Sequence, residues 1–285
     1  MKRFTKIMLI LSTVFIILGI VLMLGTGLAD DLYYGNADLN IGPVGIRIKE
    51  EITDFVDHEF GTVIKADEDY RDVRIAGNEI RELDIVVDAA ALEIIRDDQI
   101  DGVIVDGSQL LVVNHSADEE SLSLEIEKKE KYKSISQIDE AKMILRIPAH
   151  LEFEELDIYL NSSSLEAERL DAKELRVNIN ASAAEIREVN AGVLEVENNA
   201  GSLWAYGTIG EKMEVNCNAG TTEIQINGSY DDFNYEVDCN VGAIRLGNKD
   251  YSGLKSTVSL KNEGAKKSMD LNCGVGNIDI QLDEE

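Results

Sequence analysis

One short motif occurs three times, as Leu175-Arg-Val-Asn-Ile-Asn-Ala181, as Leu194-Glu-Val-Glu-Asn-Asn-Ala200 and as Met213-Glu-Val-Asn-Cys-Asn-Ala219. Their first residues are 19 positions apart in both steps (194 − 175 and 213 − 194). A constant period of this length is typical of proteins in which one supersecondary unit stacks on the next. The repeat therefore predicts a solenoid.

Further copies extend the pattern on both sides. They begin at Leu83, Leu156, Tyr235 and Met269, and the step from Met213 to Tyr235 is 22 residues (235 − 213). When the first residue of a copy is called position 0, positions 0, 2, 4, 9 and 11 are mostly apolar. Apolar residues two apart are typical of strands. The sequence predicts an all-β fold, a parallel β-solenoid or β-helix-like repeat with rungs of about 19–22 residues.

Each copy has a small residue at position 7, two residues after a column rich in asparagine. Asn and Gly tolerate left-handed backbone, so we expect a sharp corner between one strand and a second that begins at position 9. The small residues are Ala90, Ser163, Ser182, Gly201, Gly220, Gly242 and Gly276.

The three cysteines, Cys217, Cys239 and Cys273, all fall at position 4, an inward column. We interpret them as small core residues, with Cys217 and Cys239 as neighbours in the stack. Parallel side chains about 4.8 Å apart exceed the roughly 3.5–4.5 Å that separates the Cβ atoms of a disulfide. The histidines have no metal-ligand spacing, so we expect no metal and no cofactor.

The N-terminus predicts a membrane segment. Ile7 to Leu24 is 18 residues without a charge, about 27 Å as a helix, and residues 25–28 can lengthen it to cross a bilayer. Basic residues precede it and two aspartates follow, so the positive-inside rule puts the N-terminus in the cytoplasm and the rest outside. A cleaved signal peptide is the alternative. We favour a single-pass anchor because signal-peptide cores usually run only about 7–15 residues.

These features divide the chain into three parts. Residues 1–29 form the transmembrane anchor or signal segment, residues 30–82 a membrane-proximal stalk or cap, and residues 83–285 the solenoid domain. A hairpin excursion is expected near residues 115–142, with the charged stretch 125–136 at its exposed end.

The part beyond the anchor is strongly acidic. The first 29 residues hold three basic and no acidic residues, which leaves 24 Lys and Arg (27 − 3) against 55 Asp and Glu, a formal charge of −31. Nucleic acid and anionic lipid would be repelled. The remaining partners are cations, basic peptides and neutral glycans, and the alternative is that acidity only keeps an exported protein soluble.

Two outward columns are candidate binding surfaces. Position 1 is an acidic ladder, interrupted by Arg176, that either stays hydrated or recruits cations. Position 10 places the only tryptophan of the chain on the outside. An aromatic pair among carboxylates can stack on a sugar ring or hold a cationic side chain; alternatively, another segment covers it. The candidate ligand-binding residues are Trp204, Tyr206, Glu197, Glu185 and Glu223.

The order of motifs resembles a bacterial exported domain family of unknown function that is labelled "putative adhesin". The motifs are the anchor segment, Ile80-Arg-Glu-Leu-Asp-Ile85, Met143-Ile-Leu-Arg-Ile-Pro148, Leu156-Asp-Ile-Tyr-Leu-Asn-Ser-Ser-Ser164 and the successive Asn-Ala-Gly rungs. The resemblance covers about residues 80–282. It implies a cell-envelope protein, often of Gram-positive bacteria and in some cases associated with envelope-stress regulation. It carries over no catalytic residue.

Two function classes follow. The preferred one is a membrane-anchored, extracytoplasmic surface module that binds or scaffolds at the cell envelope, with a role in envelope-stress sensing as a narrower version. Its partners would be cell-wall glycan, a cationic peptide or an envelope protein, and it would not be an enzyme. The alternative is a carbohydrate-active enzyme, a polysaccharide lyase or hydrolase on a β-helix, whose acid and base would come from Glu185, Glu197 and Glu223.

Overall fold

The computed structural model describes residues 62–64, 69–132, 140–252 and 256–283. The chain divides into Met1–Glu59 and Phe60–Glu285, and the described residues all belong to the second unit. The expected anchor at residues 7–24 lies outside them and stays a prediction. Within the described ranges, no helix is long and apolar enough to cross a bilayer.

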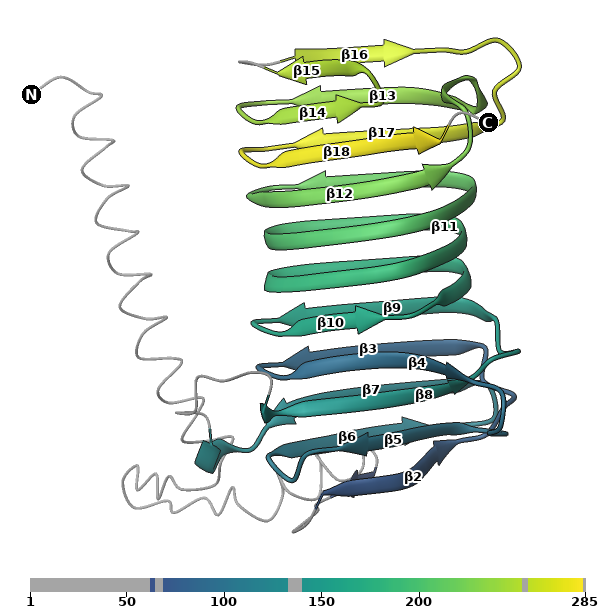
Figure 1. Ribbon diagram of the computed structural model, residues 1–285, viewed down its shortest axis with the longest axis vertical. Coiled ribbons are helices and arrows are strands. Elements are labelled where there is room, and N and C mark those ends of the chain that lie inside the picture. Colours follow the sequence, from purple (N-terminus) through teal and green to yellow (C-terminus); the bar gives the residue numbers. More distant parts are fainter. Residues whose placement is uncertain (1–61, 65–68, 133–139, 253–255, 284–285) are drawn as a thin grey trace, which may run out of the picture. The chain divides into compact units, whose positions relative to one another are not determined.

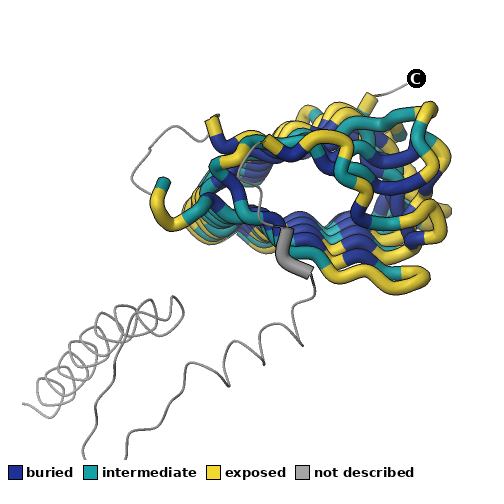
Figure 2. Tube along the Cα trace, turned by 90° about the horizontal axis from the view of Figure 1, so that it is seen from below, coloured by how far each residue is buried: buried dark blue, intermediate teal, exposed yellow. Residues whose placement is uncertain are grey.

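The described strands form two stacks around one hydrophobic core (Figure 1). Seen along the stack, each rung is a flattened loop with buried residues lining its inside and exposed residues outside (Figure 2). We call the stack that contains positions 0–5 the first face and the other the second face. The prediction of an all-β, solenoid-like fold is confirmed.

The strands of each face follow one another by hydrogen-bonded pairing. The first face runs β1 (Thr62–Ile64), β6 (Leu111–Ala117), β7 (Ser121–Lys128), β3 (Glu82–Asp88), β9 (Phe153–Asn161), β11 (Leu170–Cys217), β17 (Lys267–Cys273), β13 (Phe233–Cys239) and β16 (Ser256–Leu260). The second face runs β2 (Tyr70–Ala76), β5 (Val103–Gly107), β8 (Lys142–Pro148), β4 (Ala91–Asp97), β10 (Ser164–Ala167), β11 again, β12 (Gly220–Asn227), β18 (Asn277–Asp283), β14 (Ala243–Leu246) and β15 (Lys249–Ser252). The short helices η1 (Glu130–Tyr132) and η3 (Tyr230–Asp232) lie in connections.

Equivalent residues of the repeat lie above one another. Leu156 pairs with Leu83 on one side and with Leu175 on the other, and Met213 pairs with Met269. All five side chains are buried, together with those two and four residues further along each strand. The column arrangement expected from the sequence is therefore present.

The order of the copies in the stack differs from their order in the chain. The copy at Met269 lies between those at Met213 and Tyr235. At the other end, the copy at Leu83 lies between β7 and β9, which both follow it in the chain. The expectation that Cys217 and Cys239 are neighbours is consequently wrong, because Cys273 pairs with both of them.

The stretch expected at the exposed end of a long hairpin is partly a rung of the solenoid. Strand β7 pairs in parallel with β3, so Leu122 lies beside Leu83 and begins a further copy of the repeat. Lys128, at the end of β7, is only 4% exposed. Strands β6 and β7 do form a hairpin, with its turn between Ala117 and Ser121, while residues 133–139 lie outside the described ranges.

The corner conformation also differs from the expectation. The left-handed residues are at position 6, where Ala89, Ser162 and Ala181 have φ of 52°, 49° and 52°. Position 7 points inward against the next rung: a Cβ on Gly201 would lie 2.1 Å from the carbonyl oxygen of Ser182. Only small residues fit there because successive rungs pack so closely.

The asparagines at position 5 bind one another instead of shaping the corner. The side-chain Nδ2 of Asn180 donates to Oδ1 of Asn161 (3.1 Å), Asn199 donates to Asn180 (2.9 Å) and Asn218 donates to Asn199 (2.7 Å). The two middle amides, Asn180 and Asn199, each donate to one neighbour and accept from the other. This asparagine ladder ties four consecutive rungs together at one edge of the first face.

A buried arginine holds the opposite edge. The side chain of Arg96, at 5% exposure, donates from Nε to the carbonyl oxygen of Arg169 (3.0 Å) and from Nη1 to that of Leu151 (2.8 Å). Its Nη2 donates to Oδ2 of Asp171 (2.8 Å). One guanidinium thus satisfies backbone acceptors of several connections, which a buried polar group requires.

Replacing this arginine tests its structural role. Arg96→Met should lower the free energy of unfolding by about 3–5 kcal/mol, because the Asp171 carboxylate and several carbonyls lose their buried partner. Urea denaturation followed by circular dichroism measures the loss. The exposed Arg187→Met is the matched control and should cost less than about 1 kcal/mol; equal losses for the two variants would contradict the assignment.

The thiols of the cysteine column should react slowly, because all three are buried. Burial raises the pKa of Cys273 to about 11, and its neighbours Cys239 and Cys217 add to the shift. Because a rise in pKa from 9.0 to about 11 lowers the thiolate fraction about 100-fold, the native Cys273 thiol should react with a disulfide reagent at pH 8 about 100-fold more slowly than in urea. Thiol labelling with time measures this, and native labelling at the unfolded rate would refute it.

Candidate functional site

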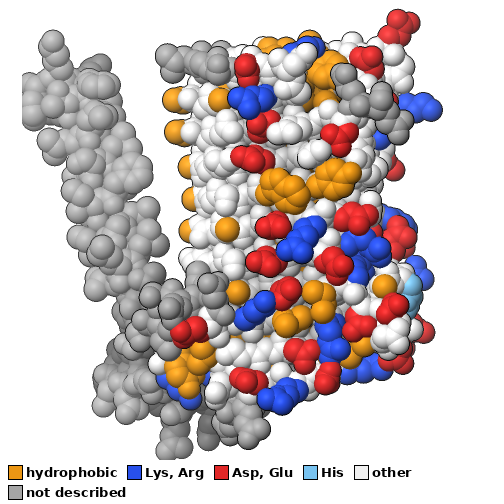
Figure 3. All heavy atoms as spheres, viewed as in Figure 1, with side chains coloured by type: hydrophobic (Ala, Val, Ile, Leu, Met, Phe, Trp, Pro, Cys, Tyr) orange, Lys and Arg blue, Asp and Glu red, His pale blue; other side chains and the backbone are white. Residues whose placement is uncertain are grey.

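A hollow of about 360 Å³ lies on the second face around Trp204. Leu203 and Ala205 point inward and are buried, so the strand alternation turns Trp204 outward, where it is 41% exposed. Hydrophobic side chains with acidic side chains above and below them are visible on one face of the stack (Figure 3). Position 10 supplies the carboxylates of the hollow, which are Glu166, Glu185 and Glu223. Position 8 supplies its small side chains, which are Ser164, Ala183, Ser202 and Thr221.

Register sets the neighbours of the tryptophan. Trp204 pairs with Glu223 on one side, and Glu185, which pairs with Glu166, lines the same hollow on the other. The rung beyond Glu223 supplies Asp279, because β18 is inserted between β12 and β14, and Arg245 of β14 lies one rung further. Asp279 is only 9% exposed and is paired with Arg245 at 3.1 Å, so the acids that face solvent in this column end at Glu223.

The carboxylates of the hollow are only partly neutralised. Nε of Arg187 lies 3.2 Å from Oε1 of Glu185. In the described part of the chain, Glu166 and Glu223 have no ion pair or side-chain hydrogen bond. An exposed ring is thus flanked by acids whose charge remains available to a ligand.

The five candidate residues do not all meet. Trp204, Glu185 and Glu223 line the hollow. Tyr206 follows on the same side of the strand, outside the lining, and its hydroxyl donates to Oδ1 of Asn227 (2.7 Å). Glu197 is a position 3 residue of the first face, where its Oε1 accepts from Asn199 (3.2 Å). The corner between residues 198 and 203 separates it from the tryptophan.

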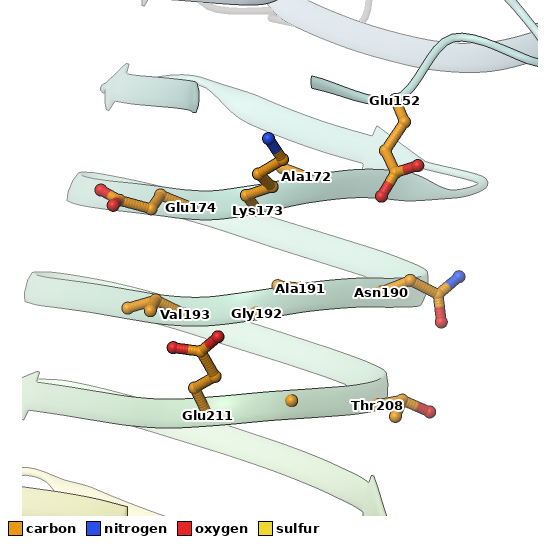
Figure 4. A pocket seen from close by; sticks show the side chains of 11 residues that line it. Glu152, Ala172, Lys173, Glu174, Asn190, Ala191, Gly192, Val193, Thr208 and Glu211 are labelled. Atoms are coloured by element: carbon orange, nitrogen blue, oxygen red, sulfur yellow. The ribbon is translucent and has the colours of Figure 1, made fainter. Parts of the chain in front are cut away.

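A second hollow, of about 520 Å³, lies at the connection between rungs and was not anticipated from the sequence. Ala191 and Gly192 form its floor, with Glu152 on one side and Glu211 on the other (Figure 4). The sequence feature that marks this hollow is Gly192 in the return segment, where a Cβ would lie 2.7 Å from the carbonyl oxygen of Lys173. The rungs pack too closely there for a side chain, so the surface above Gly192 stays open. No aromatic side chain lines the hollow.

The acidic ladder of the first face is largely paired internally. Arg176 contacts Glu155 and Asp157 in the rung on one side and Glu195 in the rung on the other. Partial burial raises the pKa of Asp84, and repulsion from Asp157 and Glu155 adds to it. Among the described residues, no group of three or more His, Cys, Asp or Glu side chains is placed to hold a metal ion. The ladder is accordingly a weaker candidate than the tryptophan hollow.

Comparison with known proteins agrees with this architecture. Residues 149–281 match the Toastrack DUF4097 family model. Among curated proteins none matches the sequence.

Two solved structures are similar. A "putative cell adhesion protein" from Clostridium sporogenes has 12% identity and a TM-score of 0.38, over 75% of this chain and 98% of that one. A "putative adhesin" from Bacteroides fragilis has 12% identity and a TM-score of 0.31, over 77% and 97%. TM-scores this low establish no shared binding function.

The exported-domain resemblance drawn from the Asn-Ala-Gly rungs and Leu156–Ser164 is thereby confirmed at the level of the domain. This part of the β-solenoid, residues 149–281, which begin just before β9 and end within β18, is similar to the Toastrack DUF4097 domain.

Proposed function

We propose that this protein is a membrane-anchored surface module that binds an envelope component through the hollow around Trp204. The observation that carries the proposal is the exposed position of the only tryptophan of the chain, in a hollow whose other large outward-pointing side chains are acids. Large exposed aromatic side chains are uncommon on soluble surfaces and are enriched where proteins bind.

The strands around the hollow support binding without rearrangement. Trp204 lies within β11 and pairs with β12, and the residues on both sides of it are buried in the core. A side chain held on a paired strand loses little further freedom when a ligand binds, which favours affinity. The mechanism would be display of a preformed surface, not chemistry.

The location of the module rests on the sequence. The uncharged segment 7–24 with basic residues before it supports a single-pass anchor that leaves the solenoid outside a bacterial cell. A role accessory to envelope-stress sensing is the narrower version of the proposal, in which occupancy of the hollow is the signal.

The enzyme alternative places acid and base on Glu185 and Glu223, on either side of Trp204. The two residues stand two rungs apart in one column, roughly 10 Å at about 4.8 Å per rung, which is close to the upper end of the about 6.5–9.5 Å that separates the carboxyl groups of an inverting glycosidase. We expect no new reducing ends or unsaturated products when the protein is incubated with wall and capsular polysaccharides. Release of such products by the wild-type protein, and its loss in Glu185→Gln, would contradict the binding proposal and support the enzyme alternative.

Removing the aromatic pair tests the binding proposal. Trp204→Ala with Tyr206→Ala should lower the affinity of the full-length, detergent-solubilised protein for purified envelope fragments roughly tenfold, because aromatic anchors often contribute more than 1 kcal/mol each. Co-sedimentation with a dilution series of fragments measures it. Tyr159→Ala, which removes an exposed aromatic ring of the first face, is the control. Unchanged retention in the double variant would refute the proposal.

A further inference from the structure

The chemistry of the hollow points to one class of ligand. Three carboxylates, Glu166, Glu185 and Glu223, and one guanidinium, Arg187, give it a formal charge of −2 (−3 + 1). Arg187 is itself 64% exposed and touches only one of the three acids. A neutral sugar would leave this excess charge uncompensated, whereas an organic cation would neutralise it.

The ring of Trp204 lies between two carboxylates of the same column. Neighbouring parallel strands are about 4.8 Å apart, so Glu185 and Glu223 stand one rung to either side of Trp204, roughly 10 Å from each other. A cation on the ring face within about 6 Å of its centroid gains a cation–π attraction. The same cation is then within reach of a carboxylate on both sides, an arrangement that guanidinium, with donors on both edges, fits best.

The small side chains beside the ring leave room for the chain that carries the cation. Ser164, Ala183, Ser202 and Thr221 follow one another at position 8, next to the column of acids. An extended segment lying along the stack would contact these short side chains and the apolar stem of its own arginine or lysine would pack on the ring.

We propose that the Trp204 hollow binds the guanidinium or ammonium group of a basic peptide segment, on the ring face between Glu185 and Glu223. This rests on the proposed function and names the ligand class of the same site. Asp279, the next residue of the column, is only 9% exposed and is already contacted by Arg245 (3.1 Å), so the acids open to the ligand end at Glu223.

The fluorescence of Trp204 reports this site alone, because the chain has one tryptophan. The full-length protein in neutral detergent is titrated with hexa-arginine, with hexa-glutamine and with a neutral N-acetylglucosamine oligomer. We expect a saturable change in emission with hexa-arginine only. Its midpoint should rise at least about tenfold in Glu185→Gln/Glu223→Gln and should rise with salt, as contacts between charges do.

A matched variant separates the site from general attraction to an acidic protein. Glu82→Gln/Glu236→Gln removes the same charge from exposed positions of the first face and should leave the midpoint within about twofold. An equal loss in both double variants would overturn the proposal.

The remaining outcomes separate the ligand class of the hollow from its binding function. Emission that responds to the oligosaccharide and not to hexa-arginine would overturn the cation proposal while leaving a binding function at Trp204. Emission that responds to neither, with envelope retention still dependent on Trp204, would also overturn it. Retention that ignores Trp204 would refute the proposed function itself.

Discussion

A rung of this protein buries its apolar side chains only when the rungs above and below repeat the same columns. A single rung is only one strand thick along the stack, about 4.8 Å, so its inward side chains are covered only by those of the rungs above and below it. The close packing that results restricts residues well outside the core: Gly201 has no room for a side chain beside Ser182. It also brings Asn161, Asn180, Asn199 and Asn218 near enough to hydrogen bond in sequence. One spacing thus governs core, corners and surface.

The repeat determines which side of a strand each residue faces, and this part of the fold could be read from the sequence. Leu156, Leu175 and Met213 are buried as their alternation required. The stacking order could not be read in the same way. Every copy offers the same inward side chains, so the pattern does not distinguish the copy at Met269 from the copy at Tyr235 as the neighbour of Met213. That choice depends on how the connections run. The copy at Leu122 was not recognised in the sequence, because its strand, β7, also pairs with an antiparallel partner, β6, and reads as one arm of a hairpin.

The candidate site shows the same division. The outward position of Trp204 follows from strand alternation, and its neighbours Glu185 and Glu223 follow from the period. Glu197 was grouped with them because it belongs to the same rung, yet the corner carries it to the other face. The hollow beside Gly192 had no periodic signal, since it arises from a return segment where the rungs pack closely. Sequence patterns identify columns; corners and connections decide which columns share a surface.

The insertion of β17 and β18 between earlier rungs gives the last residues of the chain a particular importance. Strands β13 and β14 leave the ribosome before β17 and β18, but in the finished unit they pair with them and not with the rung at Met213. The parallel partners of β13 and β14 are therefore synthesised after them, so this part of the stack can form only once β17 and β18 are present. Deletion of β17 and β18 would remove the rung on which β13 and β14 pack.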